Sequence, residues 1–168
     1  MANQITTHEL WVDGRKMSVE VRQNATDPTQ LNITWTLPPT PYTAYDGAIV
    51  LLSEEQFSAS NLPEDGARYT ASSNWTSPAD TIGSAKVVWA GYGYFGDNIQ
   101  TTTVTVSNTD PTKLYYASIH AASNVLQYYS IGIQSYPLET SRYEKSSDTY
   151  AGSIPQASTP PANPTNGT

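Results

Sequence analysis

The chain has 168 residues, enough for one domain with extensions and for a hydrophobic core that needs no covalent staples. It contains no cysteine, which excludes disulfides and thiolate metal sites. Charged residues make up only 14% of the chain and its formal net charge is -7, so a surface that binds nucleic acid through its phosphates is not expected.

The first predicted element is a hairpin over residues 9–23. The apolar run Leu10-Trp11-Val12 precedes Asp13-Gly14, and Met17, Val19 and Val21 alternate with polar residues after it. Asp-Gly favours a two-residue turn because both central positions need a positive φ. The residues before the hairpin have neither a basic start nor an apolar run, and no window approaches about eighteen apolar residues. We therefore expect no signal peptide and no membrane span.

The next segment, residues 31–39, has the two-residue period of a strand. Ile33 and Trp35 fall on one face with Leu31, and the double proline Pro38-Pro39 ends the strand by removing two backbone donors. A second strand is expected at residues 45–53. The only helix expected is one turn at residues 54–58, with Ser53 as its cap.

Two further strands, residues 86–90 and 100–106, flank a loop rich in aromatic residues and glycine. This loop is a candidate interaction loop that carries three large rings, Tyr92, Tyr94 and Phe95. We expect these rings to be exposed, because a seven-residue loop does not easily bury three large rings. Aromatic faces bind sugar rings and also form the cores of protein interfaces.

Residues 111–121 again alternate, with Tyr115 and Ile119 on one face. Tyr115 follows a turn that contains Pro111, an arrangement that suits a tyrosine corner, in which the ring is buried and the hydroxyl reaches back to upstream backbone. A closing strand is expected at residues 126–133.

Residues 31–39 and 111–121 together resemble strands B and F of a fibronectin type III-like domain, and residues 45–53 resemble its strand C. The segment Pro63–Thr70 is similar to a P-x-D-G-x-x-Y insertion of many bacterial and phage members. The resemblance covers about residues 17–137, and it leaves the path of the long segment after residue 53 open. It implies an all-β, immunoglobulin-like sandwich with a structural core that contains Trp35, Tyr115, Ile33 and Ile119.

The predicted organisation has three parts. Residues 1–16 form an amino-terminal arm that supplies the first hairpin strand, and residues 17–145 form the sandwich. Residues 146–168 contain four prolines among small polar residues and are expected to be an extended tail or linker, because they cannot bury enough apolar surface to offset their ordering entropy.

No catalytic, cofactor-binding or metal-binding residues are expected. The run Gly91–Gly96 matches G-x-G-x-x-G, but a β-branched run follows where nucleotide binding needs a helix, so a tight turn is favoured. His8 and His120 have no clustered partners, and His120 is expected to face outward, satisfied or solvated. The acidic pairs Glu54-Glu55 and Glu64-Asp65 lie in expected turns, without the separation that glycoside hydrolysis needs.

The resemblance, with the expected lack of an export signal, implies a non-enzymatic structural or accessory protein of a tailed-phage virion, in capsid decoration or in the tail and baseplate. Its partners would be other virion subunits, in a homo-oligomer or a large assembly, without nucleic acid or membrane. One alternative is a carbohydrate-binding or adhesive module of a bacterial surface or secreted protein, whose partner would be a host-surface glycan. The other alternative is a spacer module attached to an enzyme.

Overall fold

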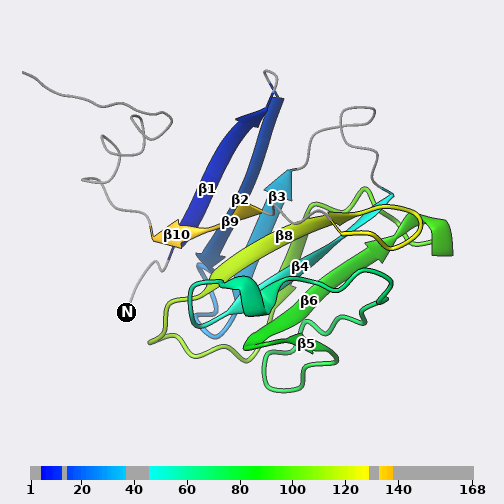
Figure 1. Ribbon diagram of the computed structural model, residues 1–168. Coiled ribbons are helices and arrows are strands. Elements are labelled where there is room, and N and C mark those ends of the chain that lie inside the picture. The colour runs from blue at the N-terminus through cyan, green and yellow to red at the C-terminus, as the bar shows by residue number, and fades with distance from the viewer. Residues whose placement is uncertain (1–4, 13–14, 37–45, 129–132, 138–168) are drawn as a thin grey trace, which may run out of the picture. The chain divides into compact units, whose positions relative to one another are not determined.

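The structure is a computed structural model that describes residues 5–12, 15–36, 46–128 and 133–137. The chain divides into one unit, Met1–Pro137, and a second unit, Leu138–Thr168. Every described residue belongs to the first unit, so the predicted tail of residues 146–168 lies outside the described residues. Within them the secondary structure is nearly all strand, with only two short 3-10 helices, which confirms the all-β prediction (Figure 1).

The first sheet contains the predicted amino-terminal hairpin. Its strand order is β10-β1-β2-β3-β7, and all neighbours are antiparallel. Val12 pairs with Arg15, so the connection has two residues, as the Asp-Gly signal predicts, although those two lie outside the described residues. The predicted boundary after residue 16 therefore falls within β2. The strands are β1 (Ile5–Val12), β2 (Arg15–Gln23), β3 (Leu31–Thr36), β7 (Thr103–Val106) and β10 (Tyr136–Pro137).

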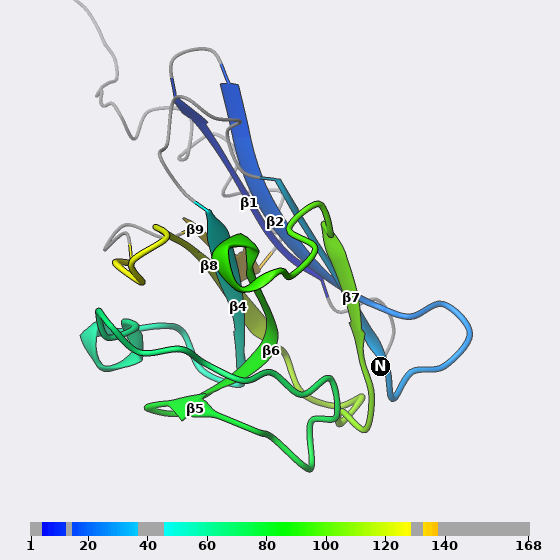
Figure 2. The same ribbon diagram turned by 90° about the vertical axis from the view of Figure 1, so that its right-hand side faces the viewer.

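The second sheet has the order β5-β6-β4-β8-β9 and is also antiparallel throughout. Figure 2 shows the two sheets as separate layers, with β1, β2 and β7 in one and β4, β6 and β8 in the other. The strands are β4 (Gly47–Ser53), β5 (Thr81–Ile82), β6 (Ala85–Tyr92), β8 (Tyr116–Ala122) and β9 (Ile133–Gln134).

The main core lies between the two sheets. Strand β3 has the burial pattern of a sheet with one wet face, because Leu31, Ile33 and Trp35 are buried while Thr34 and Thr36 are exposed. From the second sheet, Val50, Leu52, Val88, Ala117 and Ile119 pack against them, together with Tyr115 and Trp75. All four residues expected in the structural core, Trp35, Tyr115, Ile33 and Ile119, are buried in this cluster.

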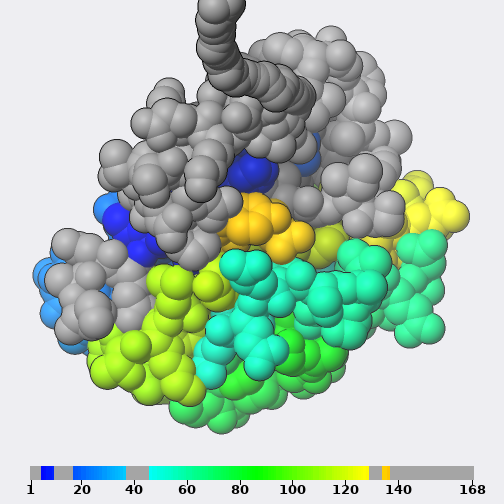
Figure 3. Space-filling model, turned by 60° about the vertical axis from the view of Figure 1, so that its left-hand side comes forward, coloured from blue at the N-terminus to red at the C-terminus, as the bar shows by residue number. Residues whose placement is uncertain are grey.

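A second core covers the outer face of the second sheet. All seven residues of β4 are buried, so this strand has no wet face. The long segment between β4 and β6 runs across the sheet, and its Phe57, Tyr69 and Ala71 pack against the buried cluster that contains Ile49 and Leu51 of β4. Figure 3 shows teal atoms of this segment forming a layer next to the yellow residues that follow β8. The path after residue 53, which the sequence left open, is therefore a cover for the sheet.

An irregularity in β6 turns two consecutive side chains toward the main core. The pairing of β4 with β6 shifts between Val50 and Leu51, so that Trp89 pairs with Val50 while Val87 pairs with Leu51. Val88 and Trp89 both pack in the main cluster, as expected at a β-bulge. Trp89 thereby contacts Trp35, with ring centroids 5.2 Å apart.

Buried hydroxyl groups join the two sheets where the chain passes from β9 to β10. Ser135 Oγ donates to Thr6 Oγ1 over 2.7 Å, and Thr6 Oγ1 donates to the carbonyl oxygen of Tyr115 over 2.8 Å. Ser135 Oγ also accepts from the backbone N–H of Ala117 over 2.9 Å. Thr6 and Ser135 are each 1% exposed, so these bonds are shielded from water.

One local prediction was wrong, and another was confirmed only in part. The helical turn expected at residues 54–58 is absent, and a 3-10 turn, η1 (Ala59–Asn61), occurs instead, capped by Ser58. Ser53 accepts a hydrogen bond from the Glu55 N–H, which stabilises a bend and not a helix. The closing strand expected at residues 126–133 does not begin at Leu126, which lies in a turn with φ 60°. Within the expected range, Tyr128 and Ile133 do pair with β8, opposite Ala122 and Ile119, and β9 begins at Ile133. Residues 129–132 lie outside the described residues.

Candidate interaction surface

The aromatic loop after β6 is divided between the interior and the surface. Tyr92 is only 3% exposed and belongs to the outer core, so the prediction that it contributes to an exposed patch was wrong. Its hydroxyl accepts from the Tyr69 N–H over 3.0 Å and lies 2.6 Å from the Tyr128 hydroxyl. Because the segment between β4 and β6 covers this face of the sheet, a ring that would otherwise be exposed there is buried.

The backbone of the loop is held by two carboxylates. The loop forms a 3-10 turn, η2 (Gly93–Phe95). The Asp46 carboxylate accepts from the Tyr94 N–H, and the Asp97 carboxylate accepts from the Tyr92 N–H over 2.9 Å. Gly96 ends the turn with φ 91°, a conformation that favours glycine. The backbone that carries the side chains of η2 is therefore fixed by hydrogen bonds.

Close packing explains the remaining glycines of the G-x-G-x-x-G match. A Cβ on Gly91 would lie 2.5 Å from the Trp89 ring, and one on Gly93 would lie 2.9 Å from the carbonyl oxygen of Asp46. Each distance is too short for a side chain. The motif is thus accounted for by packing and by the turn, and a strand follows it where a nucleotide-binding loop would lead into a helix.

The exposed part of the loop is aromatic. Tyr94 is 68% exposed and Phe95 is 44% exposed, and their rings are perpendicular with centroids 5.3 Å apart. The Arg68 guanidinium carbon lies 3.9 Å from the centroid of the Phe95 ring, as in a cation–π contact. We call these three residues the Tyr94–Phe95–Arg68 surface. Sequence reasoning found both aromatic residues and missed Arg68, which lies 27 positions before Phe95 in the sequence.

The P-x-D-G-x-x-Y segment positions Arg68. Asp65 accepts from the Tyr128 N–H over 2.8 Å, and the Gly66 N–H donates to the carbonyl oxygen of Leu126 over 2.7 Å. Tyr69 then donates its N–H to Tyr92, as described above. These bonds anchor the segment on both sides of Arg68, to the turn after β8 and to the end of β6.

A second candidate surface is the outer part of the amino-terminal hairpin. β3 pairs with β2 only from Ser18 to Gln23, whereas β1 and β2 continue to pair through Leu10 with Met17, and as far as Val12 with Arg15. Figure 1 shows these two strands extending past the end of β3. In the described residues this part of the hairpin is a two-stranded ribbon, which is marginally stable in water on its own.

The histidines and acidic residues considered as catalytic or metal-binding candidates do not lie together in one site. His120 does not face solvent as expected: it is buried on the outer face of β8 with Ser118, whose Oγ lies 2.7 Å from its Nε2. His8 packs edge-on against Tyr136. Glu54 pairs with Lys113 over 2.9 Å. No group of three or more potential metal ligands occurs in the described part of the chain.

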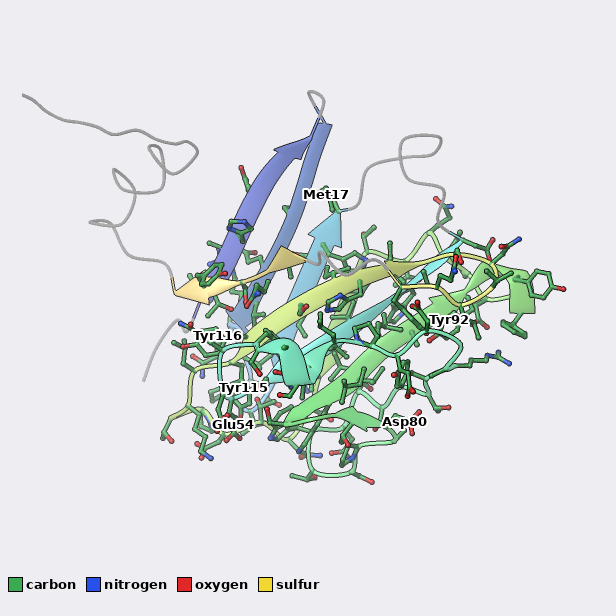
Figure 4. All side chains as sticks on the ribbon, in the orientation of Figure 1. Met17, Glu54, Asp80, Tyr92, Tyr115 and Tyr116 are labelled. Carbon is green, nitrogen blue, oxygen red and sulfur yellow. The ribbon has the colours of Figure 1, made fainter. Side chains whose placement is uncertain are left out.

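Figure 4 shows Tyr92 and Tyr115 toward opposite ends of the second sheet. Tyr115 is buried next to Trp75, and the two rings are perpendicular with centroids 5.2 Å apart. Tyr115 is therefore part of the main core. The candidate surface formed by Tyr94, Phe95 and Arg68 lies at the Tyr92 end. None of the helices in the described ranges is long and apolar enough to span a membrane.

Comparisons with protein-family models, with curated proteins and with solved structures found no match to this chain.

Proposed function

We propose that the domain is a fibronectin type III-like sandwich, on the basis of its strand order. In immunoglobulin-like folds, strand B lies between A and E, and strand F lies between C and G. Here β3 lies between β2 and β7, and β8 lies between β4 and β9. β6 then takes the position of strand C′, and β1 is an addition to the edge of the first sheet.

The surroundings of Tyr115 support the same assignment. Its ring is 1% exposed, and its hydroxyl accepts from the Asp110 N–H over 2.9 Å, five residues upstream. A tyrosine at the start of strand F that bonds to backbone a few residues before it is a tyrosine corner. Burial raises the pKa of the Tyr115 hydroxyl above its ordinary value.

The function that we propose is that of a non-enzymatic structural or accessory subunit of a tailed-phage virion, in capsid decoration or in the tail and baseplate. The single observation that carries this proposal is the ribbon of β1 and β2 beyond β3, because a marginal two-stranded element gains stability when a neighbouring subunit packs against it. The virion setting itself rests on the sequence resemblance. The body of the sandwich would be the displayed or spacing part.

A shortened hairpin tests this role. Replacing residues 11–16 by Asn-Gly would place the cross-strand pair Leu10 and Met17 directly beside a new two-residue turn. The variant and the wild-type chain would each be supplied during particle production and then measured in purified particles by antibody labelling. We expect a folded variant, judged by its thermal melt, that no longer enters particles. A folded variant that enters particles as the wild type does would contradict the proposed role of the hairpin.

A second candidate function, a carbohydrate-binding or adhesive module of a bacterial surface or secreted protein, is favoured by the Tyr94–Phe95–Arg68 surface. Sugar rings stack on exposed aromatic faces, and Tyr94 is 68% exposed. This role does not exclude a virion setting, because a displayed domain can also bind a glycan.

A further inference from the structure

The Arg68 guanidinium is held in place but leaves its hydrogen-bonding groups available. It lies 3.9 Å from the Phe95 centroid and 5.8 Å from the Tyr92 centroid, and these ring contacts are its only side-chain interactions with described residues. The ion pairs of Arg22 with Glu20 and of Lys113 with Glu54 do not involve Arg68. A guanidinium fixed by stacking can offer its N–H groups to an acceptor with little further loss of rotamer freedom.

Tyr94 supplies a different kind of contact beside it. Its ring is 68% exposed, and its hydroxyl makes no hydrogen bond with the described residues. Phe95 contacts both groups: the Tyr94 ring is perpendicular to its own, and the guanidinium lies over its face. Because the Tyr94 N–H is bonded to the Asp46 carboxylate, the backbone that carries the ring is fixed before any ligand arrives. An exposed aromatic ring and a planar cation without an ion-pair partner among the described residues therefore contact the same residue, Phe95.

We infer that the Tyr94–Phe95–Arg68 surface binds a saccharide that carries a carboxylate on its sugar ring, as hexuronic and sialic acids do. The apolar face of the sugar would stack on Tyr94, and the carboxylate would accept two hydrogen bonds from Arg68. A single sugar residue of this class offers both groups at once. This inference rests on the carbohydrate-binding role proposed above and is independent of the virion assignment.

The charges around the site favour a carboxylate over a more highly charged group. The chain has a net charge of -7, and Glu64 and Asp65 lie in the same segment as Arg68. A phosphate with two negative charges would be repelled more strongly than a carboxylate with one. The same charges mean that binding cannot come from general attraction of anions, so it must depend on the stacked guanidinium itself.

The probes for the test are short oligomers of glucuronic, galacturonic and mannuronic acid and a sialylated oligosaccharide. Each is paired with the same compound after its carboxyl groups have been reduced to alcohols. Binding to the full chain would be measured by titration calorimetry and by ligand-observed NMR at about 0.15 M salt, where the screening length is about 8 Å. The variants are R68K, Y94A and Y94F, with R22K as the matched control, because Arg22 is exposed and belongs to the first sheet.

We expect at least one acidic probe to bind at least about tenfold more tightly than its reduced form, a difference of about 1.4 kcal/mol. R68K should lose at least about tenfold although it keeps the charge, because lysine lacks the planar fork. Y94A should lose binding, Y94F should keep most of it, and R22K should match the wild type. Thermal melts would establish that all variants are folded.

Three results would overturn the inference. Equal binding of acidic and reduced probes would leave the carbohydrate role standing and refute the carboxylate. Binding to none of the probes would refute both. Acidic binding that R68K does not weaken, or that R22K weakens equally, would show that the acidic probe does not bind through Arg68 at this surface.

Discussion

The hydroxyl groups of Tyr92 and Tyr128 lie 2.6 Å apart, in a chain of hydrogen bonds that begins and ends on the same covering segment. The Tyr69 N–H donates to Tyr92, and Tyr128 donates to the carbonyl oxygen of Ala67 over 2.7 Å. Since Tyr128 has one proton and uses it there, Tyr92 is the donor between the two hydroxyls. These bonds attach the covering segment to β6 and to the turn after β8.

This pair predicts a loss of stability at alkaline pH. Burial is the main cause that raises the pKa of both hydroxyls, most strongly that of Tyr128. In the unfolded chain a tyrosine loses its proton near about pH 10. The stabilisation is therefore complete below about pH 10 and declines above it, because the unfolded state then releases protons that the folded state retains.

Denaturant unfolding at a series of pH values between 8 and about 11 would measure this decline. Tyr128→Phe should cost about 1–3 kcal/mol at neutral pH, and its stability should fall less steeply above pH 10 than that of the wild type. Tyr94→Phe, at an exposed position, serves as the control. A wild-type profile that is flat through this range would contradict the prediction.

The tyrosine corner can be tested with two adjacent residues. Tyr115→Phe removes the hydroxyl that accepts from the Asp110 N–H and should lower the free energy of unfolding by about 1 kcal/mol or somewhat more. The neighbouring Tyr116 is half-buried and makes no side-chain hydrogen bond with described residues, so Tyr116→Phe should change stability much less. Equal effects in urea unfolding would count against the corner.

Trp35 is the strongest test of the main core. Its ring is 4% exposed and lies against Trp89 of the opposite sheet. Trp35→Ala should cost about 3–5 kcal/mol, through lost burial and the cavity left between the sheets. Thr34→Ala, on the exposed face of the same strand, is the control. An unchanged thermal melt for Trp35→Ala would contradict the described packing.

The hydroxyl network at Ser135 predicts that removing this one small hydroxyl group lowers the free energy of unfolding. Ser135→Ala leaves the Ala117 N–H without its side-chain acceptor and removes the donor to Thr6, so we expect a loss of about 1–3 kcal/mol. Ser73, which is exposed and makes no side-chain hydrogen bond within the described ranges, gives the matched change Ser73→Ala. Identical unfolding midpoints for the two variants would show that the network contributes nothing.

The sequence predicted the elements whose signals are local. The alternation around Ile33 and Trp35 identified β3, and the Asp-Gly pair identified the hairpin, because the period of side chains and the needs of a turn are both set by nearby residues. The turn after β8 was missed because it contains Leu126 at positive φ. A positive φ is uncommon for leucine, so the residue type does not indicate a turn.

The exposed surface was predicted only in part, because its geometry depends on contacts between distant residues. The expectation for Tyr92 considered only the size of its own loop, whereas a segment from elsewhere in the chain covers the ring. The unbroken apolar run Ile49–Leu52 was the available sign that β4 is buried on both faces. Nothing in the residues around Arg68 indicates that it stacks on Phe95, since that contact requires the covering segment to be folded across the sheet first.

The most direct test of the proposed virion role is the number of copies of the full chain per purified particle. Particles would be washed at high salt to remove adsorbed protein, and the chain would be counted by quantitative mass spectrometry against the major capsid protein. We expect a fixed copy number that survives the wash and agrees with the symmetry of the capsid or of the tail. A chain found only in the soluble fraction, or lost from the particles in the wash, would contradict a structural role in the virion.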